Sequence, residues 1–488
     1  MKKIIASLFT LLFVCTTASA QYTSPGTGVV LSLADIAADS PSTVTVDGDE
    51  YTVLEDITIA EEDSLLIDTD LTVLMDEDVL IKIFGSFTVD ADEVTFTALD
   101  IEKPYEGFRY ENGSEIYLAN ATFEYGGGMR VLTEDFHVEW CVFLDIVSGG
   151  ATTSAVLQFS RGKPVIQHNL FGHNYLPAIG SAANTSFSPY IFDNMILENN
   201  LDNSNRPQIN IGASYEDEPI QIIDNYIIGH EDTDKVGGIA IANFMGGPLH
   251  AVISGNTIAE NRYGITVVGP NDSVIIKDNI IEYNNNETNP MMGGSGIALT
   301  STGLENPIEV YRNEIRGNLW GITVMDSKIN LGDGEANPGE NIFGENGHGG
   351  VVYALYNNSP HEIMALNNCW IEGHEATYED VEEVIFHKTD DPELGEVFFD
   401  PFLCGVLSVD DFSQEKFSFY PNPSQGEINF SNSHNFESVS VYGIQGNLLK
   451  TESVSQGVNT IEFNLPAGIY LLRFEAPHTN LTRKMIVQ

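Results

Sequence analysis

The chain has 488 residues, and its 71 acidic residues against 21 basic ones give a formal net charge of −50 at pH 7. A surface this acidic repels nucleic acid and anionic membranes, so nucleic-acid binding is excluded, and acidic polysaccharides would be repelled unless divalent cations bridge. The length exceeds what one ordinary compact core holds, so the chain has several domains or an architecture that grows in one dimension.

The first 20 residues have the order of a secretion signal. Lys2 and Lys3 are followed by an apolar run over residues 4–15 and by small residues that end at Ala20. This order predicts a cleavable signal peptide over residues 1–20 and an extracellular protein, secreted or held at the outer cell surface. No later stretch approaches about 20 uninterrupted apolar residues, so we expect no transmembrane segment in the mature chain, which would begin near Gln21.

Three cysteines remain after the predicted cleavage, Cys141, Cys369 and Cys404. They are too few and too widely spaced to build a disulfide framework. One pair can form, and Cys369 with Cys404 is favoured because these two are closest in sequence. At least one thiol is left over, and we expect it to be buried as a small apolar residue.

Residues 42–100 alternate apolar and polar side chains over several short runs. Alternation of this kind predicts half-buried strands. We interpret them as the first coils of a solenoid together with a cap, because a bare end would expose unpaired strand groups.

A local repeat then runs through the middle of the chain in eight copies. Each copy has an Asn, a large apolar residue two positions later and, in six copies, a second Asn five positions later. The first Asn of each copy is Asn169, Asn194, Asn225, Asn256, Asn279, Asn313, Asn341 and Asn368. The second is Asn174, Asn199, Asn261, Asn284, Asn318 and Asn346.

The copies are 23 to 34 residues apart, which fits coils with a constant core and variable outer loops. Asn tolerates the left-handed conformation that sharp turns need, and stacked Asn side chains about 4.8 Å apart can hydrogen-bond as a ladder. A leucine-rich horseshoe lacks support because its periodic leucines are missing. The repeat therefore predicts an all-β, right-handed, single-stranded parallel β-helix over residues 21–408, with an N-terminal cap and a closing coil.

Two extended loops, residues 230–237 and 284–294, interrupt the regular spacing. The first contains Glu231, Asp232 and Asp234, and carboxylate-rich loops suit Ca²⁺, which is the candidate cofactor. Chance clustering in so acidic a chain is the competing explanation.

Four aromatic residues, Tyr263, Trp320, Tyr353 and Tyr356, are candidates for stacking on sugar rings, with packing in the core or in an aromatic stack as the alternative. No catalytic signature is visible, so the catalytic residues are unknown.

Residues 409–488 change character and read as alternating strands of a small, immunoglobulin-like β-sandwich. The segment resembles the type A C-terminal sorting domain of type IX secretion cargo from Bacteroidetes. The matching residues include Pro421, Asn422, Pro423, Gly468, Tyr470 and Lys484. The resemblance implies handling by the type IX secretion machinery, export through the outer membrane and removal of the tail there.

Residues 45–404 resemble bacterial surface β-helices, through the segment 329–347 and through the NNCWIEG motif with residues 379–403. Members of this broad family include polysaccharide lyases, glycosidases and non-catalytic surface proteins, so the fold alone names no activity. Two hypotheses follow. The first is a secreted protein that binds or degrades an extracellular polysaccharide, and the alternative is a non-catalytic, adhesive surface solenoid.

Overall fold

The computed structural model describes residues 21–403, apart from 148, 183–184 and 301–305, and parts of the tail. The described tail residues are 419–420, 424, 426–432, 436–443, 448–466, 468–476 and 479–487. The predicted signal peptide and Cys404, with its proposed pairing to Cys369, lie outside the described residues. Among the described helices, none is long and apolar enough to cross a membrane.

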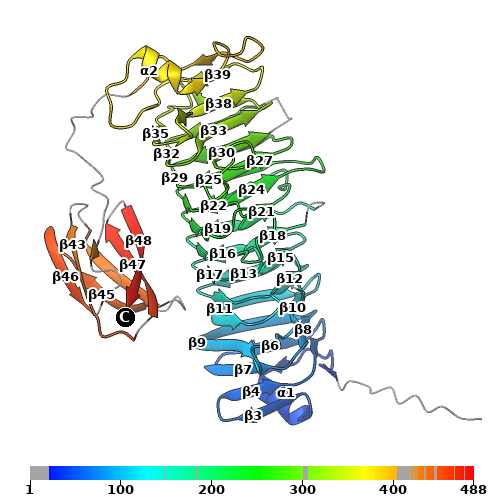
Figure 1. The fold of residues 1–488 in the computed structure, drawn as a ribbon. Helices are drawn as coiled ribbons and strands as arrows, with labels where there is room; N and C mark the ends of the chain where they lie inside the picture. Colours follow the sequence, from blue (N-terminus) through cyan, green and yellow to red (C-terminus); the bar gives the residue numbers. More distant parts are fainter. Residues whose placement is uncertain are drawn as a thin grey trace, which may run out of the picture.

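Residues 21–403 form a stack of coils whose strands pair in parallel with the coil before and the coil after (Figure 1). Each coil contributes one strand to a 14-stranded sheet, called sheet A here. The rest of the coil lies in sheet B, which has two legs separated by a sharp turn. The fold is therefore the predicted all-β parallel helix.

Sheet A contains β1 (Tyr22–Thr23), β5 (Ile57–Ile59), β8 (Leu80–Ile83), β10 (Gly107–Tyr110), β12 (Met129–Val131), β15 (Leu157–Phe159), β18 (Ile179–Ser181), β21 (Ile209–Ile211), β24 (Ile239–Ala242), β27 (Ile265–Val268), β30 (Ser295–Thr300), β33 (Trp320–Met325), β38 (Leu355–Asn358) and β40 (Ile385–Phe386).

The first leg of sheet B contains β2 (Val30–Leu31), β6 (Ser64–Ile67), β13 (Asp135–Glu139), β16 (Val165–Gln167), β19 (Tyr190–Phe192), β22 (Ile220–Ile223), β25 (His250–Ser254), β28 (Ser273–Lys277), β31 (Ile308–Tyr311), β34 (Ile329–Gly332), β39 (Ile363–Ala365) and β41 (Val397–Phe398). The second leg contains β7 (Leu71–Met75), β14 (Val142–Leu144), β17 (Leu170–Gly172), β20 (Met195–Leu197), β23 (Tyr226–Ile228), β26 (Thr257–Ala259), β29 (Ile280–Glu282), β32 (Glu314–Arg316) and β35 (Ile342–Gly344). Two long strands, β9 (Ser86–Ala98) and β11 (Glu115–Glu124), run through both legs.

The core is a set of columns of equivalent side chains, one from each coil. In the first leg the β-branched position of the repeat pairs from coil to coil in one register, and its members are Ile166, Ile191, Ile222, Ile253, Ile276 and Val310. All six side chains are fully buried. No single coil could bury its own inward face, so each coil is stabilised by its two neighbours.

The sharp turn between the two legs places the left-handed conformation on the residue before each ladder Asn. Its φ angle is 57° at His168, 49° at Asp193 and 56° at Asp224, whereas no ladder Asn has a positive φ. The expectation that the ladder asparagines themselves take this conformation is therefore wrong. The contribution of each ladder Asn is instead the hydrogen bonds of its side-chain amide.

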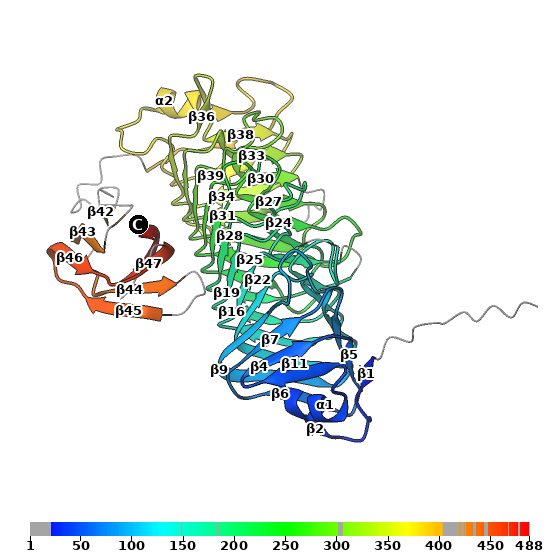
Figure 2. The same cartoon turned by 60° about the horizontal axis from the view of Figure 1, so that its bottom comes forward.

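Both ends of the stack are closed by local structure (Figure 2). At the N-terminal end, α1 (Leu33–Asp39) packs beside the antiparallel hairpin of β3 (Val44–Asp47) and β4 (Glu50–Val53). At the C-terminal end, α2 (Tyr378–Glu383) precedes the last strands, and a short hairpin joins β36 (Gly347–His348) to β37 (Val351–Val352). Both helices begin with a capping box, from Ser32 and Asp35 in α1 and from Thr377 and Asp380 in α2.

The described tail residues form two antiparallel sheets around a separate apolar core. One contains β42 (Phe419–Tyr420), β43 (Glu427–Asn432) and β46 (Gly457–Glu462). The other contains β44 (Ser438–Gly443), β45 (Leu448–Ser453), β47 (Gly468–Ala476) and β48 (Thr479–Val487). This arrangement is consistent with the small β-sandwich that the sequence predicts.

Candidate ligand-binding site

The eight asparagines of the first repeat position form one continuous column. Each Nδ2 donates to the Oδ1 of the Asn in the next coil, from Asn169 to Asn368, over 2.8–3.0 Å. All eight side chains are buried, and each also bonds neighbouring backbone groups. These amides are saturated inside the protein, so the column holds the coils together and offers nothing to a ligand.

A second column runs through the other Asn position, and it contains a residue that the sequence reasoning missed. Gln208 stands between Asn199 and Asn261, in the coil where the repeat has His230 in place of Asn. Its Oε1 accepts from Asn199 at 3.1 Å, and its Nε2 donates to Asn261 at 3.0 Å. His230 remains outside the column, because its Nδ1 accepts from the backbone of Asp232. The longer Gln side chain reaches in from an insertion, which no fixed repeat offset could have indicated.

The candidate calcium loop does not bring its carboxylates together. Asp234 accepts a hydrogen bond from Asn203 at 2.7 Å, while Glu231 and Asp232 are exposed. Among the residues that the structure describes, no group of three or more His, Cys, Asp or Glu side chains is arranged to hold a metal ion.

Three of the four candidate sugar-stacking residues lie together. Trp320 stacks on Tyr356, with ring centroids 4.5 Å apart, and Tyr353 packs beside both rings. Phe386, which the sequence reasoning missed, stacks on the other face of Tyr356 at 4.6 Å. Both faces of the central ring are thus occupied by neighbouring rings, and Trp320 itself is 92% buried.

Tyr263 does not join this stack. A Cβ placed on Gly237 would lie 2.1 Å from the Tyr263 ring, so the ring packs flat over that glycine. Burial raises the pKa of Tyr263 to about 12.

The sorting-motif residues fall partly outside the described part of the chain, because Pro421, Asn422 and Pro423 are not described. Gly468 begins β47, and Lys484 lies in β48 opposite Leu471. The Tyr470 hydroxyl donates to the Pro466 carbonyl at 2.9 Å.

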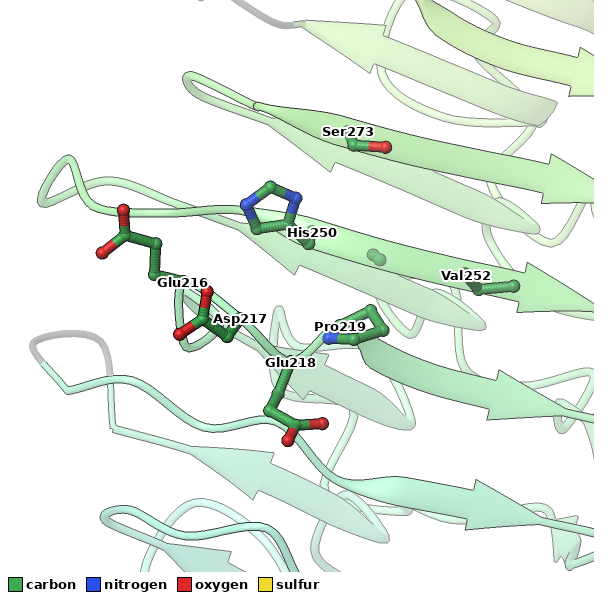
Figure 3. Close-up of a pocket in the computed structure, with 8 residues that line it drawn as sticks. Glu216, Asp217, Glu218, Pro219, His250, Val252 and Ser273 are labelled. Carbon is green, nitrogen blue, oxygen red and sulfur yellow. The ribbon is translucent and has the colours of Figure 1, made fainter.

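Two shallow hollows on the β-helix do not resemble a ligand pocket. The first has a volume of about 240 Å³ and lies beside His250 (Figure 3). Its Glu216, Asp217 and Glu218 side chains point in different directions, and Glu218 pairs with Lys163 at 2.9 Å. The second is of similar size and is lined by residues at and before the starts of β11 and β13, which include Glu115, Glu134 and Asp135. Both are small and acidic, whereas ligand pockets are usually larger and mainly apolar.

The outward face of sheet A differs in composition from the rest of the molecule. None of the 14 strands of sheet A contains an Asp or a Glu, although the chain has 71 acidic residues. The strands of sheet B carry many, including Glu115, Glu139, Glu309 and Glu314. An extended face whose strands contain no acidic residue is, on so acidic a protein, the most distinctive surface in the described residues.

One outward position of each strand forms a column along this face, called the outward column here. Its members lie between inward, buried neighbours and pair from coil to coil. They are Thr23, Thr58, Lys82, Arg109, Arg130, Gln158, Gly180, Asn210, Ala240, Thr266, Ala298, Thr323, Tyr356 and Phe386. The column is cationic toward the N-terminal end, small and polar in the middle, and aromatic toward the C-terminal end.

Two family models match the chain. Residues 190–333 match the right handed beta helix region, and residues 418–488 match the secretion system C-terminal sorting domain. The chain has no match among the curated proteins or the solved structures with which it was compared.

The parallel coils and the first match define a right-handed parallel β-helix. With the second match, the chain is a secreted or cell-surface β-helix protein that carries a C-terminal sorting domain. That domain marks the chain for the type IX secretion machinery, which delivers proteins to the cell surface or the extracellular space.

Proposed function

We propose that the mature protein binds an extracellular polysaccharide along the outward face of sheet A. The acid-free outward column carries this proposal. Its members recur about every 4.8 Å, one from each of the 14 strands. A linear polymer fits such a surface better than a compact ligand does, because the side chains that could contact it follow one another from coil to coil along one face.

The side chains of the outward column suit sugar hydroxyls. Gln158, Asn210 and Thr266 supply amide and hydroxyl groups, and the Thr266 hydroxyl already donates to Ala298 at 2.8 Å, so its oxygen remains as an acceptor. Gly180 and Ala240 alternate with these polar residues along the column, and their small size leaves room for a ligand to approach the sheet. The Tyr356 and Phe386 rings at one end add apolar edges against which a sugar can pack.

The chain divides, in this proposal, into a signal peptide at residues 1–20, the binding β-helix at 21–408 and the sorting domain at 409–488. The secretion machinery handles the last segment and removes it, and the β-helix then acts outside the cell. We favour binding without turnover, because the amides of the two Asn columns are already hydrogen-bonded within the protein and the two hollows are shallow.

A pair of matched double variants tests the proposal. Asn210→Leu with Thr266→Leu removes two polar groups from the outward column, while Gln221→Leu with Ser254→Leu makes a similar change on the first leg of sheet B. On the polysaccharide selected by a glycan panel, we expect the first variant to bind at least about tenfold more weakly, since each lost hydrogen bond contributes about 1 kcal/mol. The second should bind as the natural protein does. Equal loss in both, or no loss in the first at unchanged melting temperature, would refute the assignment to sheet A.

A further inference from the structure

The only charged side chains of the outward column are cationic, and they lie on three consecutive coils. Lys82 in β8 pairs in register with Arg109 in β10, which pairs with Arg130 in β12. Adjacent members are one strand spacing apart, about 4.8 Å. These three residues are called the basic column here.

The basic column is costly for the folded protein. Like charges directly opposite one another on a sheet are destabilising. Within the part of the chain that the structure describes, one carboxylate is bonded to them, that of Glu111, whose Oε1 lies 3.3 Å from the Lys82 Nζ and 2.7 Å from the Arg109 Nε. Among the described residues, the Arg130 guanidinium has neither a hydrogen bond nor an ion pair. Three cations against one bonded carboxylate leave a positive surface on a chain whose net charge is −50.

Glu106 is a second acidic neighbour, at the turn before β10. Burial raises its pKa, and Asp56 and Asp78 raise it further, while Arg109 acts in the opposite direction. Glu106 therefore lies within the field of Arg109, yet no ion pair joins the two among the described contacts. Arg109 therefore has only its Nε bonded to a carboxylate among the described contacts, which leaves its terminal nitrogens and the Arg130 guanidinium as donors for a ligand.

We infer that the basic column binds the anionic groups of an acidic saccharide, with Arg130 as the main anchor. The planar guanidinium forms paired hydrogen bonds with a carboxylate or a sulfate, and the next coil adds the Gln158 amide for a neighbouring hydroxyl. This inference rests on the proposed function and specifies its ligand class. It also revises the expectation from net charge, because the repulsion of acidic polysaccharides by the whole surface is reversed locally on this face.

The short length of the basic column favours a saccharide over a longer polyanion. Three cations span only about 10 Å along the stack. Beyond Arg130 the outward column has no further cation, and the rest of the molecule is strongly acidic. A nucleic-acid backbone would leave the basic column within two or three phosphates and meet repulsion, whereas a saccharide continues over neutral polar side chains.

The test compares three oligosaccharides of equal length by titration calorimetry with the secreted protein. One carries uronic carboxylates, one carries sulfates and one is neutral. We expect the natural protein to prefer an acidic oligosaccharide over the neutral one by at least about tenfold, with the two acidic probes showing which anion is preferred. The affinity for that probe should fall with added salt.

Matched variants locate the binding. Arg130→Gln should weaken the acidic probe at least about tenfold, and Arg130→Lys should retain part of the affinity. Arg312→Gln changes the charge equally at the turn between the two legs of sheet B, where Arg312 pairs with Asp278, and should change affinity less than about twofold. Equal losses in Arg130→Gln and Arg312→Gln, at unchanged melting temperature, would overturn the inference. So would binding of the neutral probe alone, which would leave the proposed function standing, whereas no binding of any saccharide would end both.

Discussion

Asp63 anchors the N-terminal segment to the first coils. Its carboxylate accepts backbone hydrogen bonds from Gly26, Thr27, Gly28 and Val29 over 2.6–3.0 Å. Burial raises the pKa of this carboxyl, but the hydrogen bonds outweigh burial and lower the pKa to about 2.

Strong acid should therefore loosen this end of the stack. Because the folded pKa lies below the unfolded one, the stabilisation is present above about pH 4 and is lost as the pH falls towards 2. Asp63→Asn should lower the free energy of unfolding at pH 7 by about 2 kcal/mol and abolish this part of the acid response. Hydrogen exchange of residues 26–29 checks both effects, and an acid response that is the same in the variant would contradict the account.

Asn256 is a representative ladder residue, and its loss should be costly. Its Nδ2 donates to the Ile222 carbonyl and to Asn279, and its Oδ1 accepts from the backbone and side chain of Asn225. Asn256→Ala leaves several of these buried groups unpaired, at about 1–3 kcal/mol each. We expect a fall of about 3 kcal/mol or more in the stability of the adjoining coils. Asn306→Ala, which removes one exposed hydrogen bond, is the control and should change stability by less than about 0.5 kcal/mol.

At the scale of the element, Gln208 keeps the second Asn column continuous through a coil that has no Asn at the repeat position. Gln208→Ala removes its hydrogen bonds to Asn199, Asn261 and the Ile228 carbonyl. We expect about 2–4 kcal/mol of destabilisation, seen as a lower melting temperature. Gln208→Asn should be nearly as damaging, because the shorter side chain cannot span the gap. Gln158→Ala, in the outward column, should have little effect, and equal effects at the two positions would contradict this reading.

The same elements show what sequence reasoning could reach. The first ladder was predictable because its Asn, the apolar residue after it and the β-branched residue before it keep fixed offsets along the chain. The strands of sheet A do not begin at a fixed distance from the ladder Asn, because insertions of variable length precede them. Gly264 and Gly321 each stand two residues before a Thr of the outward column, but β15 and β21 have no Gly at the matching position.

The candidate site depended on contacts between distant parts of the chain and was harder to predict. Lys82, Arg109 and Arg130 are 21–27 residues apart, and only the register of sheet A puts them in one column. The carboxylates of the 230–237 loop are close in sequence, yet they do not converge on one point. Proximity along the chain was therefore a poor guide to proximity in space.

At the scale of the whole molecule, the charge distribution separates two kinds of face. Sheet B and the loops carry the acidic residues, which keep an exported solenoid soluble and resist association along its length. Sheet A carries none in its strands and keeps a neutral to positive line of side chains. Because each coil contacts only its neighbours, that line could be varied coil by coil without loss of the fold.

The most direct test of the central claim is the structure of the secreted protein with a bound oligosaccharide chosen by its affinity. The account predicts that the sugar lies along the outward column of sheet A, with an acidic group on Arg130. A sugar bound in the hollow beside His250, on a leg of sheet B or within the 230–237 loop would contradict it.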